Sequence, residues 1–572
     1  MEKHILQTLF FPFTKDIKEQ DLYLVGKNFF ITNDKKVRVL SQGTTDFLTY
    51  FNSFPVGKYK EYTILKEFKL FLDISEGRGI LKLKVRRGKR IFILNTIEIS
   101  SSININFEVS DFEEIDSLSI EYQAIEDSKI ENLLFMTEDK TLRDIKLAIC
   151  TTTFNREESV NKLSKNLASS KLKNIAHLFI INNGDEIKVE ETPFISVIKN
   201  KNIGGTGGFM RGLSEAVKHG FFTHCMFIDD DAYCHPESIE KAVEFLSFCR
   251  KDDESVAGAM LYEKKPYLQY EAGATIEEFN LTPRNLNFDL TRLDAVAENN
   301  LIGRADYGPW WFFIFPIKEK LKYSFPFFVR GDDVTFSLRN NFKPIMMNGI
   351  CSWQESFDAK ISPVTEYLAF RSFIMISLVF LEKSPNFGKL SLLILKRFTS
   401  ELFGMRYSIC RALIESLKDV MKGPEFWKVN MEMKERLGEL KNSELEPNIK
   451  LIRDGGQLIF NNRYGGKLRK LLTVATLGGN VLPAFFQQKV KTTYGLHSAP
   501  FLSLGAKRIN YYSEENGLTL SYGRNRKIFF SSLFLALFVL VKFYLNGKKI
   551  RREYLQELEN FESRKFWEDT FK

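Results

Sequence analysis

Apolar and polar positions alternate through the first 145 residues of the chain. The clearest runs are residues 80–85 and 102–107, in which apolar and polar side chains take turns. This period of two is typical of strands with one buried face, and glycines between the runs supply turns. We therefore predict that residues 1–145 fold as a β-sandwich, with an open barrel as the alternative.

From residue 146 the pattern changes to short apolar runs separated by amphipathic stretches. Apolar runs at 147–151, 178–181 and 226–228 alternate with helical stretches at 156–169 and 208–219. Strand, helix and strand in this order indicate a parallel sheet with crossover helices. We predict an α/β domain over residues 146–380.

After about residue 380 the short apolar runs disappear and helical periodicity dominates, as in residues 389–418 and 528–545. This pattern predicts a helical C-terminal domain over residues 381–572. Residues 528–541 carry no charge, but the run is shorter than the roughly 20 residues that a spanning helix needs. With basic residues on both sides it fits a helix lying on an anionic membrane surface, and a buried core helix is the alternative.

Composition limits the classes of partner. The formal charge of +9 comes from 81 basic and 72 acidic residues, a small surplus on a chain of 572 residues. It favours small anionic ligands or a lipid surface and argues against dedicated nucleic-acid binding. The six cysteines form no CxxC pair and the N-terminus lacks a cleavable signal, so we expect a cytoplasmic protein with reduced thiols.

Three consecutive aspartates, Asp229, Asp230 and Asp231, follow one of the apolar runs. Ionised carboxylates at the end of a buried strand repel one another and are costly to bury without a cation. Alternate residues of an extended segment point the same way, so Asp229 and Asp231 can share one ion while Asp230 faces elsewhere. Hard oxygen ligands predict Mg²⁺ or Mn²⁺ and, through the ion, a phosphate. A solvated acidic turn is the alternative.

Three further polar segments follow predicted strands, where ligands bind in a parallel sheet. Residues 151–156 end in Arg156 and offer hydroxyl, amide and guanidinium groups to a nucleotide diphosphate, although helix capping also explains parts of them. Residues 182–185 are a weaker candidate because a turn explains them completely. In residues 200–211 four glycines precede a helix and let backbone approach a ligand, which favours a sugar-nucleotide contact over a flexible turn.

Two later segments add aromatic and acidic groups. Trp310 and Trp311 form an indole pair of the kind that stacks on the apolar face of a sugar, and a buried aromatic cluster is the competing interpretation. Asp332 and Asp333 again end an apolar strand. A second acidic pair without a second metal motif suggests a general base for a sugar hydroxyl, with a solvated turn as the alternative.

In chain order these features are a nucleotide-side loop, a glycine loop, metal aspartates, an aromatic platform and an acidic base. The order resembles the GT-A glycosyltransferases of family 2 and, among them, the bacterial cell-wall galactofuranosyltransferases. The strings that carry the resemblance are TTTFNRE, NKNIGGTGGFMRG, FIDDDAYCHPESI, DYGPWWFFIFP and FFVRGDDVTFSLR, with LQTLFFPF, TYFNSFP and TVATLGGNVLP outside the catalytic region.

The resemblance implies an N-terminal β-sandwich, a central GT-A (Rossmann-like) domain and a helical C-terminal domain. It also implies an inverting transfer of galactofuranose, or a related furanose, from UDP to a hydroxyl of a growing cell-surface glycan or lipid-linked glycan. In that mechanism Asp229 and Asp231 would bind Mn²⁺ or Mg²⁺. Asp333 would deprotonate the acceptor, and Asp332 would orient sugar or acceptor. The expected donor contacts are Thr153, Arg156, Asn183, Asn202, Gly205, Asp230, Trp310 and Trp311.

Two positions depart from the family's pattern. The family places a metal-binding histidine directly after a tryptophan, and this chain has Gln354 after Trp353. An amide oxygen can still bind a hard cation, so Gln354, Glu355 or water is expected at the third position. Where this chain has Gly331 the family more often carries a tryptophan, which implies a pocket open to a bulkier sugar, for example an N-acetylated one.

Two other functions stay open at the level of the sequence. One is transfer from a pyranose donor in polysaccharide synthesis, and the other is an inactive relative that binds glycans. Retention of both acidic pairs argues against the inactive relative, whereas Gln354 speaks for it. We expect a homo-oligomeric enzyme at the inner face of the cell membrane, with a peripheral membrane contact and no nucleic-acid partner.

Overall fold

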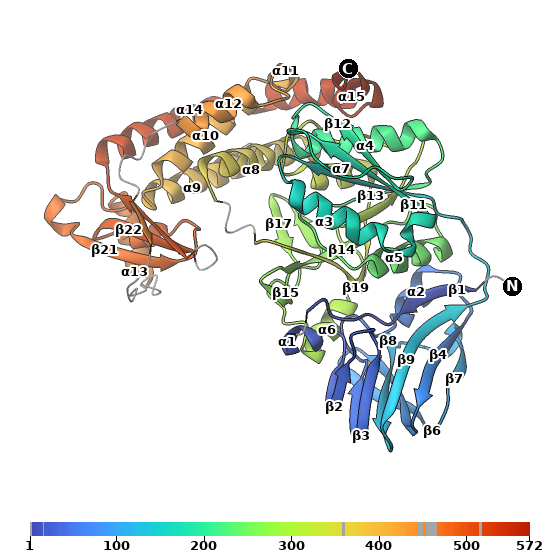
Figure 1. Cartoon of the computed structure of the whole chain (residues 1–572). Coiled ribbons are helices and arrows are strands. Elements are labelled where there is room, and N and C mark those ends of the chain that lie inside the picture. The colour runs from blue at the N-terminus through green and yellow to red at the C-terminus, as the bar shows by residue number, and fades with distance from the viewer. Residues whose placement is uncertain are drawn as a thin grey trace.

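The computed structural model describes residues 3–14, 16–356, 361–381, 383–442, 450–453, 466–513 and 517–572. Figure 1 shows strands at the N-terminal end in blue, a mixed region of strands and helices in green, and helices with a small sheet towards the C-terminus. The six cysteines are buried and free, as the sequence predicts.

The N-terminal strands form one hydrogen-bonded sheet of nine strands in the order β6-β5-β8-β3-β9-β4-β7, with β1 on β9 and β2 on β3. All these pairings are antiparallel, and Leu81 and Leu83 of an alternating run point into the core. The strands expected from the alternation are therefore present, and their arrangement as a sandwich stays a prediction. The bounds are β1 His4–Thr8, α1 Ile17–Gln20, β2 Val25–Ile31, β3 Val37–Asp46, α2 Val56–Tyr62, β4 Glu67–Glu76, β5 Gly79–Arg87, β6 Arg90–Ile99, β7 Ile103–Glu108, β8 Ser117–Ala124 and β9 Ser128–Thr137.

The central sheet has eight strands in the order β12-β11-β10-β13-β18-β14-β15, with β19 on β14. The strands β12, β11, β10 and β13 are parallel, as predicted, but β18 runs antiparallel to both of its neighbours. The predicted parallel sheet with crossover helices is therefore present over β10 to β13, and β18 adds an antiparallel strand to it. The bounds are β10 Leu147–Thr153, β11 Ala176–Asn182, β12 Ile195–Lys199, β13 His224–Phe227, β14 Val256–Tyr262, β15 Lys265–Glu271, β18 Phe313–Pro316 and β19 Ile345–Gln354.

Five helices and one hairpin accompany this sheet in the described part of the chain. They are α3 Glu157–Ala168, α4 Gly204–His219, α5 Pro236–Phe248, α6 Leu293–Asn300 and α7 Asp332–Asn340, with the hairpin strands β16 Ala274–Glu277 and β17 Asn280–Pro283. Helix α4 packs on β10 and β11. It begins at the first glycine of the predicted loop rather than at Gly208, because close packing favours glycine there despite its low helix propensity.

The C-terminal region contains helices and also a four-stranded sheet that the sequence analysis did not predict, and its standing as a helical domain stays a prediction. Alternation in Lys489–Tyr494, with β-branched and aromatic residues, was the overlooked signal. The helices are α8 Pro363–Met375, α9 Phe387–Phe403, α10 Tyr407–Met421, α11 Pro424–Val429, α12 Lys434–Asn442, α13 Lys467–Ala475, α14 Arg526–Phe561 and α15 Arg564–Thr570. The sheet order is β20 Lys450–Arg453, β23 Leu518–Gly523, β22 Ala506–Ser513 and β21 Lys489–Tyr494.

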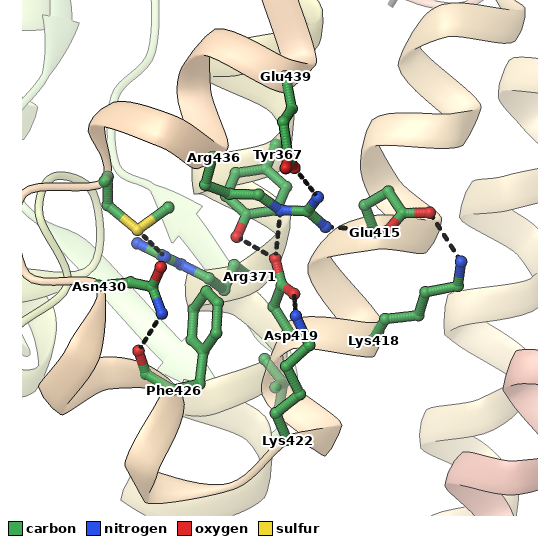
Figure 2. A network of polar contacts seen from close by, with 12 residues as sticks. Tyr367, Arg371, Glu415, Lys418, Asp419, Lys422, Phe426, Asn430, Arg436 and Glu439 are labelled. Atoms are coloured by element: carbon green, nitrogen blue, oxygen red, sulfur yellow. Dashed lines mark hydrogen bonds and ion pairs between the residues drawn. The ribbon is translucent and has the colours of Figure 1, made fainter.

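Two large apolar cores and one small cluster hold the described chain together. The first runs from the N-terminal sheet through the central domain, and the second joins the C-terminal helices to Phe325 and Phe327. A buried ionic network fastens α8 within the second core (Figure 2). In it, Asp419 of α10 accepts hydrogen bonds from the Tyr367 hydroxyl (2.6 Å) and from Arg436 of α12 (2.7 Å). Helix α8 is thus held firmly where it borders the site described next.

Candidate active site

The segments that follow β10, β12 and β13 line a cavity of about 720 Å³, and helices α7 and α8 supply another wall. Most of the predicted site residues meet there, although they come from segments far apart in the sequence. Those that line the cavity are Arg156, Gly205, Asp229, Asp230, Asp231, Trp310, Trp311, Asp332, Asp333 and Gln354. Thr153, Asn183 and Asn202 are not part of the lining.

Asp229 and Asp231 face the same partner, as their spacing predicts. The Gln354 side-chain amide donates hydrogen bonds to both carboxylates, at 2.9 Å to Asp229 and 3.2 Å to Asp231. Burial, and next the negative charge of Asp231, raise the pKa of Asp229 to about 7. Two carboxylates held this close form a strongly negative position that a cation or a proton relieves.

The donor set fits a divalent cation with Gln354 as its third protein ligand. The Gln354 Oε1 atom is buried without a hydrogen-bond partner in the described chain, while its Nε2 atom bridges the aspartates. Exchange of the two amide atoms would point an oxygen at the carboxylates, an arrangement that a bound cation would stabilise. Within the described residues no group of three His, Cys, Asp or Glu side chains is placed to hold a metal ion. The amide therefore matters to any such site.

Arg156 is tied to the aspartate triplet. Its Nη1 atom lies 3.1 Å from a carboxylate oxygen of Asp230 and 2.6 Å from one of Asp231. Asp230 is buried, and burial raises its pKa. The guanidinium offsets part of the negative charge, and at about half exposure it also borders the cavity. It can therefore reach a diphosphate placed beside the aspartates.

The predicted glycine loop forms the first turns of α4, and its glycines serve mainly to pack backbone against other segments. A Cβ on Gly204, where φ is +75°, would lie 2.0 Å from the carbonyl oxygen of Phe328. A Cβ on Gly208 would lie 1.9 Å from the Thr152 hydroxyl. Gly205 differs, because it lines the cavity and its nearest neighbour would be a Val329 methyl at an ordinary 3.5 Å. Of the glycines in this turn, Gly205 is the one exposed to a ligand in the cavity.

Asn183 and Asn202 support this turn from outside the cavity. The Asn183 side chain donates to the Gly204 carbonyl (3.0 Å), and Asn202 accepts from the Gly204 amide (3.2 Å). Thr153 is buried at the end of β10. The predicted donor contacts of these three residues stay predictions, and in this structure their side chains lie behind the cavity wall.

Trp310 and Trp311 form part of a buried aromatic cluster and also border the cavity, and their stacking on a sugar stays a prediction. Each is at least 94% buried and packs in the first core, and each also lines the cavity. The Trp311 indole donates to the Gly258 carbonyl (3.0 Å), which fixes its ring. The Trp310 Nε1 atom is buried and has no partner in the described chain, so a ligand in the cavity could accept its hydrogen bond.

Asp332 and Asp333 open the first turn of α7, and their surroundings separate their roles. The Thr206 hydroxyl donates to Asp332 at 2.6 Å, whereas Asp333 accepts from the backbone of Val334 at 2.8 Å. Burial raises the pKa of Asp332, and burial together with the Asp332 charge raises the pKa of Asp333 well above its ordinary value. A carboxylate with raised proton affinity is suited to accept a proton. Asp333 is therefore the better candidate for the base.

The sequence analysis did not predict two of the residues that line the cavity. Glu271 ends β15, is buried, and accepts a 2.8 Å hydrogen bond from the Tyr307 hydroxyl. Burial raises the pKa of Glu271 to about 7. The sequence signal for Glu271 was a single acidic residue at the end of a strand, which is far weaker than a triplet or a pair. Tyr307 could be noticed in the sequence only as a neighbour of the two tryptophans.

The loop before the acidic pair has an unusual backbone. Phe328, Arg330 and Gly331 have φ angles of 74°, 70° and 77°, which are costly for the first two because they carry side chains. Helix α8 holds this loop: Arg371 donates to the Phe327 carbonyl, and the Ser372 hydroxyl donates to the Arg330 carbonyl at 2.6 Å. The helix thereby fixes the start of α7 and its two acids.

The space beside Gly331 is occupied by α8. A Cβ on Gly331 would lie 2.9 Å from the Ser372 Cβ atom and 3.2 Å from the Ile376 Cδ1 atom. Glycine is therefore required here by the left-handed backbone and by the nearby helix. The wider pocket for a bulkier sugar, which was inferred from this glycine, gains no support from its surroundings.

Comparison with known proteins identifies the domain that carries this cavity. Residues 148–302 match the family described as Glycosyl transferase family 2. The chain is 22% identical over 427 residues to galactofuranosyltransferase GlfT2 of Mycobacterium tuberculosis, which covers 68% of this chain and 67% of the relative. For GlfT2 of Mycolicibacterium smegmatis the identity is 21%, covering 67% of this chain and 65% of the relative. The resemblance to galactofuranosyltransferases expected from the motifs is thus confirmed, as is the α/β catalytic domain.

Solved structures give weaker likenesses. A structure of GalNAc-T7 with UDP, GalNAc and Mn²⁺ has a TM-score of 0.32 and 10% identity, covering 54% of this chain and 59% of that chain. A structure of S. aureus TarS has a TM-score of 0.30 and 12% identity, covering 54% and 94%. TM-scores this low support no conclusion about function.

Proposed function

Because residues 148–302 form a glycosyltransferase family 2 domain, we propose that the chain transfers galactofuranose, or a related furanose, from UDP to a hydroxyl of a growing cell-surface glycan. The observation that carries the proposal is one cavity with two acidic sets of different character. Asp229 and Asp231 share the Gln354 amide, whereas Asp333 lies at the start of α7 with raised proton affinity. The galactofuranosyltransferase resemblance supports the choice of donor.

The chain's own groups divide the reaction between them. Asp229, Asp231 and Gln354 would hold Mn²⁺ or Mg²⁺, which supplies the positive charge that stabilises departing UDP. Arg156 borders the same part of the cavity and can contribute a second positive charge. Asp333 takes the proton of the acceptor hydroxyl as that oxygen attacks the sugar, and Thr206 keeps Asp332 oriented beside it. Attack from the side opposite to UDP inverts the anomeric configuration.

The test is a donor panel assayed with and without Mn²⁺. Purified protein is incubated with UDP-galactofuranose, UDP-galactose and other nucleotide sugars, and UDP release and product are measured. We expect turnover with the furanose donor that chelation removes. Turnover with pyranose donors only would refute the choice of donor, and no turnover with any donor would favour the inactive relative that binds glycans.

We also propose a peripheral position at the inner face of the cell membrane. In the described chain, two helical segments, Pro363–Phe380 and Arg526–Phe561, are long and apolar enough to cross a membrane, but the first is largely buried and borders the cavity. On α14, Phe534, Phe538 and Leu545 are 70%, 58% and 72% exposed. Their spacing places them on one stripe, opposite the face that packs on α9 and α10.

Basic residues and a second apolar surface accompany this stripe. Lysines lie along the helix at Lys527, Lys542, Lys548 and Lys549, where they complement an anionic leaflet. Near the start of α14, Arg526 donates to the Leu482 carbonyl of a neighbouring segment. That segment and α13 expose further apolar side chains, namely Leu468, Leu471, Val481, Phe485 and Phe486.

The expected homo-oligomer stays a prediction, which light scattering would test.

A further inference from the structure

A second cavity of about 390 Å³ adjoins the one that holds the acidic residues. It lies between the β16–β17 hairpin and the helices α8 and α9. The two cavities share Phe279, Asn280, Ala369 and Phe373 in their lining, so they lie side by side. The aspartate triplet and Arg156 line only the first cavity. A ligand in the second cavity therefore approaches from the side away from the proposed UDP position.

Helix α8 relates the second cavity to the proposed base. Ser372 and Ile376 border Gly331, directly before the acidic pair, and both line the first cavity. Phe373 lies on the same helix and lines both cavities, while Glu366 and Phe370 line the second. Along α8 the lining thus passes continuously from the acidic pair into the second cavity. An acceptor whose hydroxyl meets Asp333 can extend along this path.

The second cavity combines flat apolar surfaces with polar groups. Phe370 and Phe373 stack, with ring centroids 5.7 Å apart and planes 18° apart, and Phe279 adds a third ring. The polar groups include Asn280 and Ser400. Aromatic rings that meet the C–H faces of a sugar, together with groups that bind its hydroxyls, are the chemistry of a glycan site.

The charge of this cavity favours a neutral ligand over a phosphate. Arg397 pairs with Glu366 at 2.5 Å and lies 3.8 Å from a carboxylate oxygen of the buried Glu401. Its positive charge is thus largely neutralised by carboxylates, and Lys396 is the remaining cation of the lining. Neutral hydroxyl-rich units fit this balance better than a diphosphate does.

The hairpin forms one wall of the cavity. Glu278, at the tip between β16 and β17, forms an ion pair with Lys389 of α9, and Phe279 follows it into the lining. The hairpin therefore reaches from the central domain to α9 and covers the path between the two cavities. A chain of sugars would lie between the hairpin on one side and α8 and α9 on the other.

We propose that this second cavity binds the sugar units next to the reacting end of a neutral oligosaccharide acceptor. The proposal rests on the proposed function, since it requires a transfer reaction in the first cavity. The site would make the enzyme select acceptors by length: an acceptor of one sugar reaches only Asp333, whereas longer ones also occupy the second cavity. Catalytic efficiency in the native protein should therefore rise with acceptor length.

The test fills the cavity with a large side chain. Ser400→Trp introduces an indole into the lining from α9, and Lys396→Trp does so at an exposed position that leaves the core untouched. Leu392→Trp is the matched control, because Leu392 lies on the same helix, is 66% exposed and does not line either cavity. Acceptors are galactofuranose oligosaccharides of one, two and four sugars.

We expect both cavity variants to raise KM for the tetrasaccharide by about tenfold, the effect of losing roughly 1.4 kcal/mol of binding, with KM for the single sugar unchanged. UDP release from the donor without acceptor should be unchanged in all three variants, which tests the transfer site separately. Equal loss for short and long acceptors, or no loss in either cavity variant, would overturn the proposal.

Direct binding provides a readout that needs no turnover. Calorimetry with the tetrasaccharide in the presence of UDP should show saturable binding to the native protein and to Leu392→Trp, and weaker binding to Ser400→Trp. Absence of tetrasaccharide binding to the native protein would refute the second site even if UDP release is normal. If inorganic pyrophosphate occupies the second cavity and the tetrasaccharide does not, the cavity is a phosphate site instead.

Discussion

Two adjacent glycines at the start of α4 should respond to alanine in opposite directions. At Gly204 the left-handed backbone costs an alanine about 1–2 kcal/mol. The new Cβ would lie 2.0 Å from the Phe328 carbonyl oxygen, which also accepts the Thr206 amide at 3.1 Å. Displacing that carbonyl forfeits a hydrogen bond worth about 1 kcal/mol. We expect Gly204→Ala to lower the free energy of unfolding by about 2–3 kcal/mol.

At Gly205 the added methyl meets only a Val329 methyl at 3.5 Å. Glycine in a helix is less stable than alanine by roughly 0.5–1 kcal/mol, so Gly205→Ala should stabilise the chain slightly. Tryptophan fluorescence during thermal unfolding compares the two variants with the native protein. A melting temperature for Gly204→Ala at or above the native value, or a clear fall for Gly205→Ala, would refute the packing argument.

Four further predictions concern the site and the membrane surface. Asp333→Asn should abolish transfer and leave the UDP affinity, measured by calorimetry, unchanged. Normal transfer by this variant would show that Asp333 is not the base. Gln354→His should lower the Mn²⁺ concentration for half-maximal activity by about tenfold, about 1.4 kcal/mol, since imidazole binds transition metals well; an unchanged or higher value would exclude position 354 as a ligand. Because burial raises the pKa of Glu271 to about 7, the folded state binds its proton more tightly than the unfolded state. Its contribution to stability therefore falls as pH rises from about 4.5 to 7, and Glu271→Gln should flatten that dependence in melting curves; an equally steep curve would contradict the shift. Replacing Phe534 and Phe538 together by serine should reduce sedimentation with anionic vesicles, whereas serine at the equally exposed Phe221 should not; equal losses would argue against a docking face on α14.

Local patterns predicted the parts of the fold and site that depend on neighbours in sequence. The strand before Asp229 and the period-two runs near the N-terminus are of this kind, because burial on one face leaves a direct trace in the residue order. The four-stranded sheet of the C-terminal region was missed because its strands lie among helical segments, with α13 before β21 and α14 after β23. The alternation in Lys489–Tyr494 was too brief to stand out against the surrounding helices.

Features that depend on distant contacts could not be predicted in this way. The glycines of α4 suggested ligand contact, but Gly204 is fixed by the carbonyl of Phe328, a residue far along the chain. Gln354 was expected as a weak substitute ligand, and its bridge between two carboxylates became visible only when β19 was placed beside β14. Glu271 gave only the signal of a single acid.

The grip of α8 on the strained loop before Asp332 limits how this chain can be divided into modules. Arg371 and Ser372 hold that loop, yet α8 packs in the same core as the C-terminal helices. A fragment cut at residue 380 would keep these two side chains but lose the helices that hold α8 in place. Chimaeras that exchange C-terminal regions between relatives should therefore transfer residues 325–333 together with α8, so that the loop and its clamp stay matched.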